Sequence, residues 1–342
     1  MHLSVIIVCV FILYILPNFS FCVECFMLTE KFFQPMKDGT EIAVNRWIPD
    51  DKEQCKAVIV LSHGMLEHSL RYDRAGCLMA EAGFVFSAHD HRGHGKTAFT
   101  AEQKGTGTFG LLAKKNGFEA VVSDLAEIIE KAKADFPGKK IILLGHSFGS
   151  FVAQAYIEQK GGLIDGCVLC GTAGPMNGTV WAGKLLTGVV SLFHKPEYKS
   201  EFVQKVVFGG YNKRIPEVIT GFEWISANKA NVDMYMNDSW CGGTASIGFF
   251  RDLLGGLLKI HKKSAMKKIP CTLPVFLIAG QDDPVGKYGK TIEKLADIYR
   301  KNGMQTVDMK FYPGDRHELF NELDGDKAVQ DVLDWITRTV LK

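Results

Sequence analysis

The sequence contains no long run of charged residues of one sign. Its 342 residues include 40 Lys and Arg and 38 Asp and Glu, which gives a formal net charge of +2. Proteins that bind nucleic acid usually gather their basic residues in a patch or a track, so we expect no nucleic-acid partner. Internal repeats and low-complexity tracts are also missing, and 46% of the residues are hydrophobic. These features predict a globular chain with a large core.

Sequence motifs for cofactors are missing as well. The chain has no phosphate-binding loop and no dinucleotide fingerprint, and the segment HELFNE, which begins at His317, differs from the zinc motif H-E-x-x-H. Cys167 and Cys170 form a C-x-x-C pair in an apolar run, but no second pair completes a zinc site. We therefore expect no cofactor and no metal, and we expect this cysteine pair to lie in the core.

Three histidines lie close together in the segment HDHRGHG, at His89, His91 and His94. Gly and Arg interrupt them, and the segment follows a predicted strand. We expect these side chains to form hydrogen bonds that organise the floor of a site, and not to bind a metal.

The nine cysteines are scattered along the chain. Most lie in apolar runs, which favours buried free thiols. A cleavage after residue 22 would leave seven, and this odd number weighs against an oxidising compartment. The cysteines are Cys9, Cys22, Cys25, Cys55, Cys77, Cys167, Cys170, Cys241 and Cys271.

Residues 1–26 form a hydrophobic leader, because no charged residue occurs between Leu3 and Val23. Three interpretations are open: a signal peptide, a membrane anchor, or a leader that is absent because translation starts at Met27. The residues before the apolar run include no Lys or Arg, and Pro17 interrupts the run. We expect a cytoplasmic protein, with a membrane-anchored or a secreted protein as the alternatives.

The remaining chain predicts a sheet. Alternating residues from Thr29 to Ile48, with Asp38-Gly39 between them, predict an antiparallel hairpin with a two-residue turn. Six short apolar runs then alternate with helical patterns, which predicts a mostly parallel sheet with helices on both faces. The runs are AVIVLSHG, FVFSAHDHRGHG, IILLGHSFG, GCVLCGTAG, LPVFLIAGQDD and VDMKFYPGDRH.

One of the covering helices is clear from its spacing. It precedes IILLGHSFG and ends at Pro137-Gly138. The apolar residues that recur at helical intervals are Val121, Val122, Leu125, Ile128, Ile129 and Ala132.

The regular alternation stops between Thr172 and about Lys263, which predicts a helical cap inserted into the core. The expected parts are therefore a first core part at 27–171, the cap at 172–263 and a second core part at 264–342. Within the cap, the segment TVWAGKLLTGVVSLF carries one charge in fifteen residues. Packing against other cap helices is the favoured interpretation of this segment, and lining an acyl pocket is the alternative.

The segment LLGHSFGS contains the pattern G-x-S-x-G around Ser147. This pattern is typical of a sharp strand-to-helix turn that presents a serine hydroxyl at the carboxyl edge of a sheet. An apolar strand pattern precedes the motif and a helical pattern follows it, as the turn requires. Ser147 is therefore our candidate nucleophile.

A serine nucleophile needs a base and an acid, which in this arrangement follow it along the chain in the order acid, histidine. Asp283 follows one predicted strand and is our candidate acid, with Asp282 as the alternative. His317 follows the last predicted strand and is the candidate base, which accepts the serine proton and returns it to the leaving alcohol. Asp315 is expected to be a turn residue.

Two backbone N–H groups should bind the oxyanion of the tetrahedral intermediate. One belongs to Phe148, the residue after the nucleophile. The other is expected from the loop after AVIVLSHG, where Met65 follows His63-Gly64.

Five segments resemble the monoacylglycerol lipase and lysophospholipase branch of the α/β-hydrolases, also described as serine aminopeptidase-like hydrolases. They are SHGMLEHSLRYDR, AHDHRGHGKT, GHSFGS, GQDDPVG and GDRHELFNE, and the resemblance extends from about Phe32 to the C-terminus. It implies an α/β-hydrolase fold with a triad of Ser147, Asp283 and His317, and oxyanion donors at Met65 and Phe148. Thr97, where the branch often has serine, and the hydrophobic leader depart from the pattern.

The resemblance implies a cofactor-free serine esterase that acts on a small-molecule lipid ester such as a monoacylglycerol or a lysophospholipid. A cap that opens on a lipid surface would add a peripheral membrane contact. The alternatives are a short-chain esterase, a thioesterase or an aminopeptidase on the same triad, or a non-catalytic binding protein on this fold. An aminopeptidase would need acidic cap residues, such as Glu201 or Glu223, beside the substrate amine.

Overall fold

The computed structural model describes residues 28–342 of the chain. The predicted leader at 1–26, with Cys9, Cys22 and Cys25, lies outside the described residues. Among residues 28–342, no helix has both the length and the apolar character needed to cross a bilayer.

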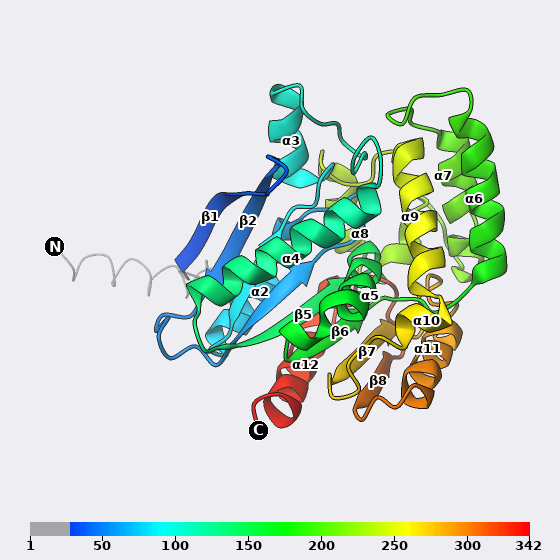
Figure 1. Ribbon diagram of the computed structural model, residues 1–342. Helices are drawn as coiled ribbons and strands as arrows, with labels where there is room; N and C mark the ends of the chain where they lie inside the picture. The colour runs from blue at the N-terminus through cyan, green and yellow to red at the C-terminus, as the bar shows by residue number, and fades with distance from the viewer. Residues whose placement is uncertain (1–27) are drawn as a thin grey trace, which may run out of the picture.

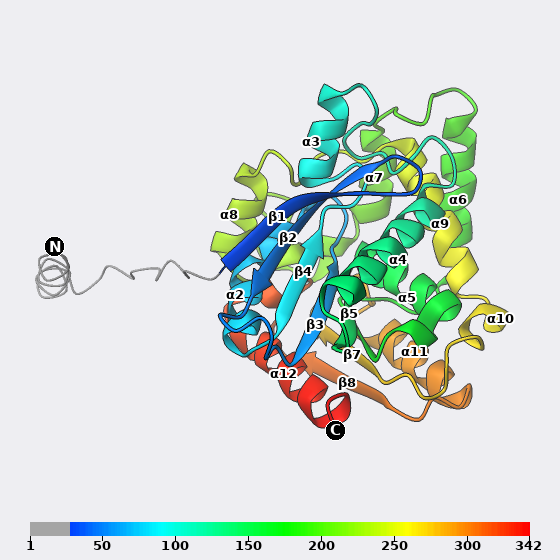
Figure 2. The same ribbon diagram turned by 60° about the vertical axis from the view of Figure 1, so that its left-hand side comes forward.

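Eight strands form one sheet in the order β1-β2-β4-β3-β5-β6-β7-β8. The pairs β1/β2 and β2/β4 are antiparallel and every other pair is parallel, which confirms the predicted opening hairpin and mostly parallel sheet. The strands, labelled in Figure 1 or Figure 2, are β1 (Leu28–Pro35), β2 (Glu41–Ile48), β3 (Ala57–Ser62), β4 (Val85–His89), β5 (Lys140–His146), β6 (Gly166–Cys170), β7 (Val275–Gly280) and β8 (Val307–Tyr312).

The turn of the first hairpin is longer than predicted. Met36 N donates to Thr40 O at 2.8 Å, so the loop holds the three residues 37–39 and not two. Gly39 has a φ of 86°, the left-handed conformation that closes a three-residue hairpin loop. The Asp-Gly pattern marked the position of the turn correctly, but its length depends on the register of the two strands.

Helices cover both faces of the sheet (Figure 2). The helices α4 (Gly117–Asp135), α5 (Phe148–Lys160) and α11 (Lys290–Lys301) pack on one face, and α2 (Asp73–Glu81) and α12 (Gly325–Thr339) pack on the other. Successive side chains of a strand point to opposite faces, so strand β5 contributes Leu143 to the first core and Leu144 to the second. All six apolar residues predicted for α4 are buried in the first core.

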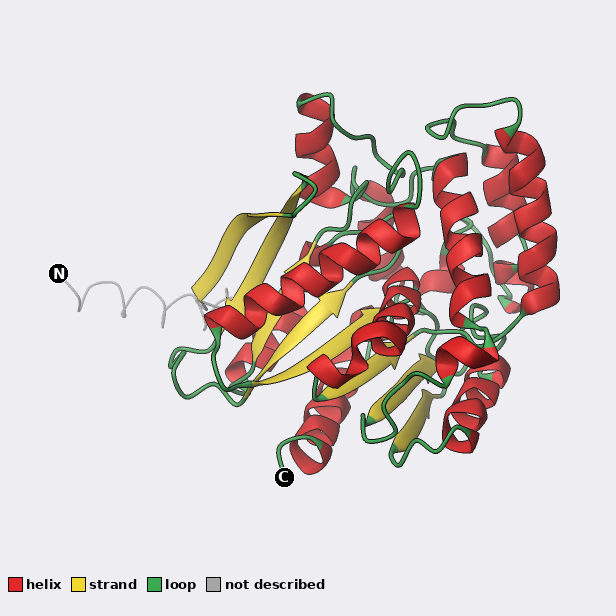
Figure 3. Cartoon of the chain, in the orientation of Figure 1, coloured by secondary structure: helices red, strands yellow, loops and turns green. Residues whose placement is uncertain are grey.

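A long helical segment, residues 171–274, joins β6 to β7; we call it the β6–β7 segment. Figure 1 shows its helices α6, α7 and α9 side by side beyond the carboxyl ends of the central strands, and Figure 3 shows the same arrangement. Its helices are α6 (Asn177–Ser191), α7 (Glu201–Phe208), α8 (Lys229–Asn237), α9 (Ile247–Ile260) and α10 (Lys263–Met266), with the short turns η3 (Tyr211–Arg214) and η4 (Glu223–Ile225). Helix α3 (Gly95–Gln103) and the turns η1 (Ser69–Tyr72), η2 (Gly161–Leu163) and η5 (Leu319–Asn321) complete the described elements.

The six described cysteines are free. Cys167 and Cys170 are buried in β6, as predicted, and burial raises the pKa of both thiols. The prediction of buried thiols is wrong for Cys271, which is exposed, and Cys77 is half-buried. Cys271 lies in a turn just before β7, where an apolar run in the sequence does not ensure burial.

Candidate active site

Ser147 lies in a tight turn between β5 and α5. Its φ is 51° and its ψ is −119°, a backbone conformation that residues with a side chain rarely adopt. A Cβ at Gly149 would lie 1.9 Å from Ser62 O, and a Cβ at Gly145 would lie 2.6 Å from Gly149 O. The two glycines are therefore required because the turn passes so close to the neighbouring backbone.

The structure brings three of the predicted residues into one hydrogen-bonded line. His317 Nε2 lies 2.7 Å from Ser147 Oγ, and His317 Nδ1 lies 2.9 Å from Asp283 Oδ2. A carboxylate only accepts hydrogen bonds, so Nδ1 carries the proton and Nε2 is free to accept from the serine hydroxyl. Asp283 is fully buried, and its other oxygen accepts from Val285 N at 2.8 Å. This arrangement prepares the serine hydroxyl to give up its proton.

The other two candidate carboxylates lie outside this line. The Asp282 side chain is exposed. Asp315 closes the turn before His317, where its N–H donates to Tyr312 O at 3.3 Å, as expected for a turn residue. Burial, together with the charge of Glu322, raises the pKa of Asp315 to about 6.

Met65 and Phe148 both line the same cavity as Ser147 and His317. Phe148 is the first residue of α5, so its backbone N–H has no intrahelical acceptor and remains available. In the loop that carries Met65, Gly64 N donates to the Glu67 carboxylate, and Leu66, the residue after Met65, has a φ of 53°.

The cavity above Ser147 has a volume of about 530 Å³ and lies between the sheet and the β6–β7 segment. One face of α6 lines it, together with residues of α7 and α9. The apolar residues of these helices that line it include Val180, Leu186, Val207, Leu253, Leu254 and Leu257. Helix α6 packs against α9, which confirms the favoured interpretation of its apolar segment, and it also lines this cavity, which was the alternative.

A buried polar network beneath His317 was not predicted from the sequence. The Glu67 carboxylate accepts from Tyr72 OH at 2.8 Å and lies 3.1 Å from His146 Nδ1. On the other side of the ring, His146 Nε2 lies 3.2 Å from the backbone oxygen of His317. Arg71 donates to the Glu318 carboxylate at 2.5 Å. This network links the loop after β3 to the segment that carries His317.

The protonation of this network follows from its contacts. Burial alone would lower the pKa of His146, but the hydrogen bond and charge of Glu67 raise it. Burial alone would raise the pKa of Glu67, but His146 and Arg71 lower it. The raised pKa of His146 and the lowered pKa of Glu67 both favour an imidazolium beside a carboxylate.

The histidine cluster is buried next to this network and includes His63. His63 Nδ1 donates to Gly64 O at 2.7 Å, and His63 Nε2 accepts from His91 N at 3.0 Å, which joins the loops after β3 and β4. Burial lowers the pKa of all four histidines, to about 4 for His89 and His94. They are therefore neutral at pH 7.

Thr97 keeps the hydrogen bonds of a hydroxyl at its position. Its Oγ1 accepts from Ala43 N at 2.9 Å and donates to Asp90 O at 2.8 Å. A serine could make the same two bonds, so this departure from the family pattern preserves the local structure.

The strand order, the helices on both faces and the long insertion before β7 define an α/β-hydrolase fold. The chain belongs to the Hydrolase_4 family, described as serine aminopeptidase, S33, whose profile matches residues 53–324. It is thus a member of a hydrolase family.

Similar proteins include ester hydrolases. The chain is 26% identical to the monoacylglycerol lipase of Mycolicibacterium smegmatis, over 87% of this chain and 93% of that protein. It is 26% identical to the human monoglyceride lipase, over 84% and 82% of the two chains. The crystal structure of a thermostable carboxyl esterase from Bacillus coagulans in complex with glycerol superposes with a TM-score of 0.83, at 26% identity, over 92% of this chain and 99% of that chain.

Proposed function

We propose that the protein is a serine hydrolase of carboxylic esters that acts on monoacylglycerols or lysophospholipids through an acyl-enzyme. One observation carries this proposal: the hydrogen-bonded line of Ser147, His317 and Asp283 opens into a largely apolar cavity of about 530 Å³. Such a cavity suits one acyl chain, and two similar proteins are monoacylglycerol lipases by name.

In this mechanism the Ser147 oxygen attacks the ester carbonyl carbon while His317 Nε2 takes the hydroxyl proton. The N–H groups of Met65 and Phe148 stabilise the oxyanion of the tetrahedral intermediate. His317 then gives its proton to the leaving alcohol, and the acyl group stays on Ser147. A water molecule, deprotonated by the same histidine, releases the fatty acid and restores the serine. Asp283 keeps the imidazole in the required tautomer throughout.

The charges of the cavity favour an ester over a peptide with a free amino terminus. Among the described residues that line it, the acidic ones are Glu67 and Glu318, and both are ion-paired with Arg71. Glu223 accepts hydrogen bonds from the backbone of residues 219–221, and Glu201 lines a different cavity. Glu67, Glu318 and Glu223 therefore already have partners, and Glu201 does not line the cavity that contains Ser147.

The test of the nucleophile is labelling with a fluorophosphonate. We expect the wild-type protein to be labelled and Ser147→Ala to be unlabelled. The variant Ser150→Ala, which alters a buried hydroxyl three residues away, should keep its label. Equal labelling of the wild type and Ser147→Ala would refute the role of Ser147.

The substrate class is tested by comparing hydrolysis rates for three kinds of substrate: acyl esters of glycerol, acyl esters of glycerophosphate, and aminoacyl amides. The acyl chain length is varied within the two ester series. We expect the highest kcat/KM for long single-chain esters. Activity confined to aminoacyl amides would overturn the assignment in favour of an aminopeptidase.

We further propose that the β6–β7 segment acts as a cap that touches lipid surfaces. Its outer side exposes apolar side chains, with exposed fractions of 71% for Leu185 and 78% for Leu192. We expect Leu185→Asp/Leu192→Asp to sediment with phosphatidylcholine vesicles at least about tenfold less than the wild type. Leu323→Asp, at an equally exposed leucine outside this segment, is the control. Equal sedimentation of all three proteins would exclude this contact.

The location of the protein can be tested directly by cell fractionation. We propose a cytoplasmic protein, and we expect most of it in the soluble fraction of the cell. Mature chains outside the cell that begin near Val23 would contradict this location.

A further inference from the structure

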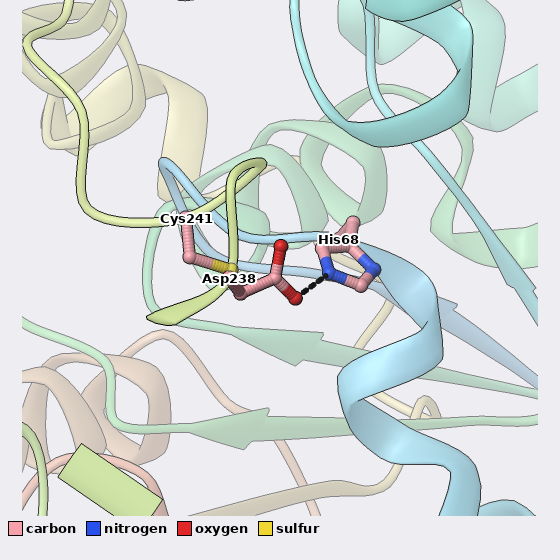
Figure 4. Close-up of side chains that lie close together, drawn as sticks. All are labelled: His68, Asp238 and Cys241. Atoms are coloured by element: carbon pink, nitrogen blue, oxygen red, sulfur yellow. Dashed lines mark hydrogen bonds and ion pairs between the residues drawn. The ribbon is translucent and has the colours of Figure 1, made fainter. Parts of the chain in front are cut away.

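A second cluster of reactive side chains lies outside the proposed catalytic residues, where the core meets the β6–β7 segment (Figure 4). It consists of His68, just before η1, Asp238, at the end of α8, and Cys241, three residues further on. One ligand atom of each side chain lies within 4.8 Å of the other two. We propose that these three side chains bind a divalent transition-metal cation such as Zn²⁺.

The donor set supports this choice of cation. An imidazole nitrogen, a carboxylate oxygen and a thiolate sulfur are the protein ligands that Zn²⁺ accepts, and three of them leave the fourth tetrahedral position for water. On binding, the Cys241 thiol loses its proton to solvent and a sulfur–metal bond forms, with no change of oxidation state. The charges of the thiolate and of Asp238 then balance the charge of the cation.

Two of the ligands are held in place by a turn. Cys241 N donates to Asp238 O at 3.0 Å, so both side chains leave the turn close together. Trp240 N donates to Asp238 Oδ1 at 2.8 Å, which leaves Oδ2 directed at His68. Two ligands three positions apart in a turn and a third from a distant segment are a common arrangement in zinc sites.

His68 supplies the third ligand, and one hydrogen bond is exchanged for the metal bond. Its Nε2 lies 2.7 Å from Asp238 Oδ2, and its Nδ1 is buried and has no hydrogen-bond partner among the described residues. When Nε2 offers its lone pair to a cation, bonds from Nε2 and from Asp238 Oδ2 to the cation replace their hydrogen bond, and the ring proton moves to Nδ1. The ring of Trp240 packs edge-on against His68, with centroids 5.4 Å apart, and fixes its orientation.

The site was not predicted from the sequence, because the expectation of no metal rested on closely spaced ligands. His68 precedes Asp238 by 170 positions. The fold alone brings them together, and Gly242 N already donates to Leu66 O at 3.2 Å beside them. A bound cation would therefore cross-link the loop that carries Met65 to the β6–β7 segment and restrain both.

Cobalt is the direct probe of this site. We expect Co²⁺ added to the wild-type protein to give a near-ultraviolet thiolate-to-cobalt charge-transfer band at one equivalent, and Zn²⁺ to remove it. The band should vanish in Cys241→Ser. In Asp238→Asn we expect the affinity for Co²⁺ to fall roughly tenfold or more. Cys271→Ser, which removes an exposed thiol elsewhere, should keep it. No band in the wild type, or the same band in Cys241→Ser, would overturn the site.

A second measurement tests the consequence, and this part rests on the proposed function. We expect saturating Zn²⁺ to slow ester hydrolysis by the wild type and by Cys271→Ser, and to leave Cys241→Ser unaffected. Equal inhibition of all three proteins would show that the cation acts elsewhere. The cobalt band does not depend on activity, so failure of the ester assignment and failure of the metal site are distinguishable.

Discussion

At the scale of single residues, neighbours of the same type can occupy very different surroundings. Two adjacent aspartates follow β7, yet Asp283 is buried against His317 while Asp282 is exposed. The structure thus places Asp283, and not Asp282, beside His317, and the role of Asp283 as the catalytic acid stays a prediction.

This difference gives a matched pair of variants. We expect Asp283→Asn to lower kcat by about 10⁴-fold, because the amide no longer holds the required tautomer of His317. Asp282→Asn should leave kcat within about twofold of the wild type, because the exposed Asp282 side chain does not contact His317. Steady-state kinetics on a monoacylglycerol measures both. A large loss in Asp282→Asn with normal activity in Asp283→Asn would reverse the assignment of the acid.

The residues that sequence reasoning missed are those whose partners are distant. Glu67, Arg71 and Tyr72 all lie in the segment SHGMLEHSLRYDR. Their hydrogen-bond partners, His146 and Glu318, lie far away in the sequence. A motif can mark such residues as unusual, whereas only the folded chain shows which charge faces which.

At the scale of elements, the turn between β5 and α5 carries the proposed nucleophile, and the strands around it were the easiest elements to predict. All six apolar runs after the hairpin became strands, because buried parallel strands leave a strong continuous signal. The length of the hairpin turn and the two faces of α6 were harder to predict, because strand register and the shape of the cavity decide them.

The close packing of this turn predicts the effect of one methyl group. In Gly149→Ala the new Cβ would meet Ser62 O, so we expect a loss of about 3 kcal/mol or more in the free energy of unfolding. Gly162→Ala places its Cβ in open space and serves as the control, expected within about 0.5 kcal/mol of the wild type. Denaturant unfolding measures both. A fully stable Gly149→Ala would mean that the turn is looser than described.

At the scale of the whole molecule, the buried histidines make stability depend on pH. The pKa of an unfolded histidine is about 6.5, and burial lowers that of His89 and His94 to about 4 in the fold. Between these values the unfolded chain binds more protons, so stability falls as the pH falls from about 6.5 to 4. His146 acts in the opposite direction, because its raised pKa gives stability that is lost as the pH rises.

We therefore expect the free energy of unfolding to fall steeply below pH 6.5, by about 3 kcal/mol for each of His89 and His94 at pH 4. His89→Leu should flatten this dependence, whereas His194→Leu, at an exposed histidine, should not. Denaturant unfolding at a series of pH values is the measurement. A constant free energy from pH 7 to 4.5 would contradict the neutral state of the cluster.

The backbone conformation of Ser147 also has a consequence for natural selection. A serine held at a φ of 51° costs about 1 to 3 kcal/mol that a glycine would largely avoid, even after glycine's greater freedom in the unfolded chain is counted. We expect Ser147→Gly to melt at a higher temperature than both the wild type and Ser147→Ala, because alanine keeps the backbone strain. Both variants lack the hydroxyl, so the difference isolates the backbone. If the order holds, selection for catalysis has kept at this position a residue that selection for stability alone would have replaced.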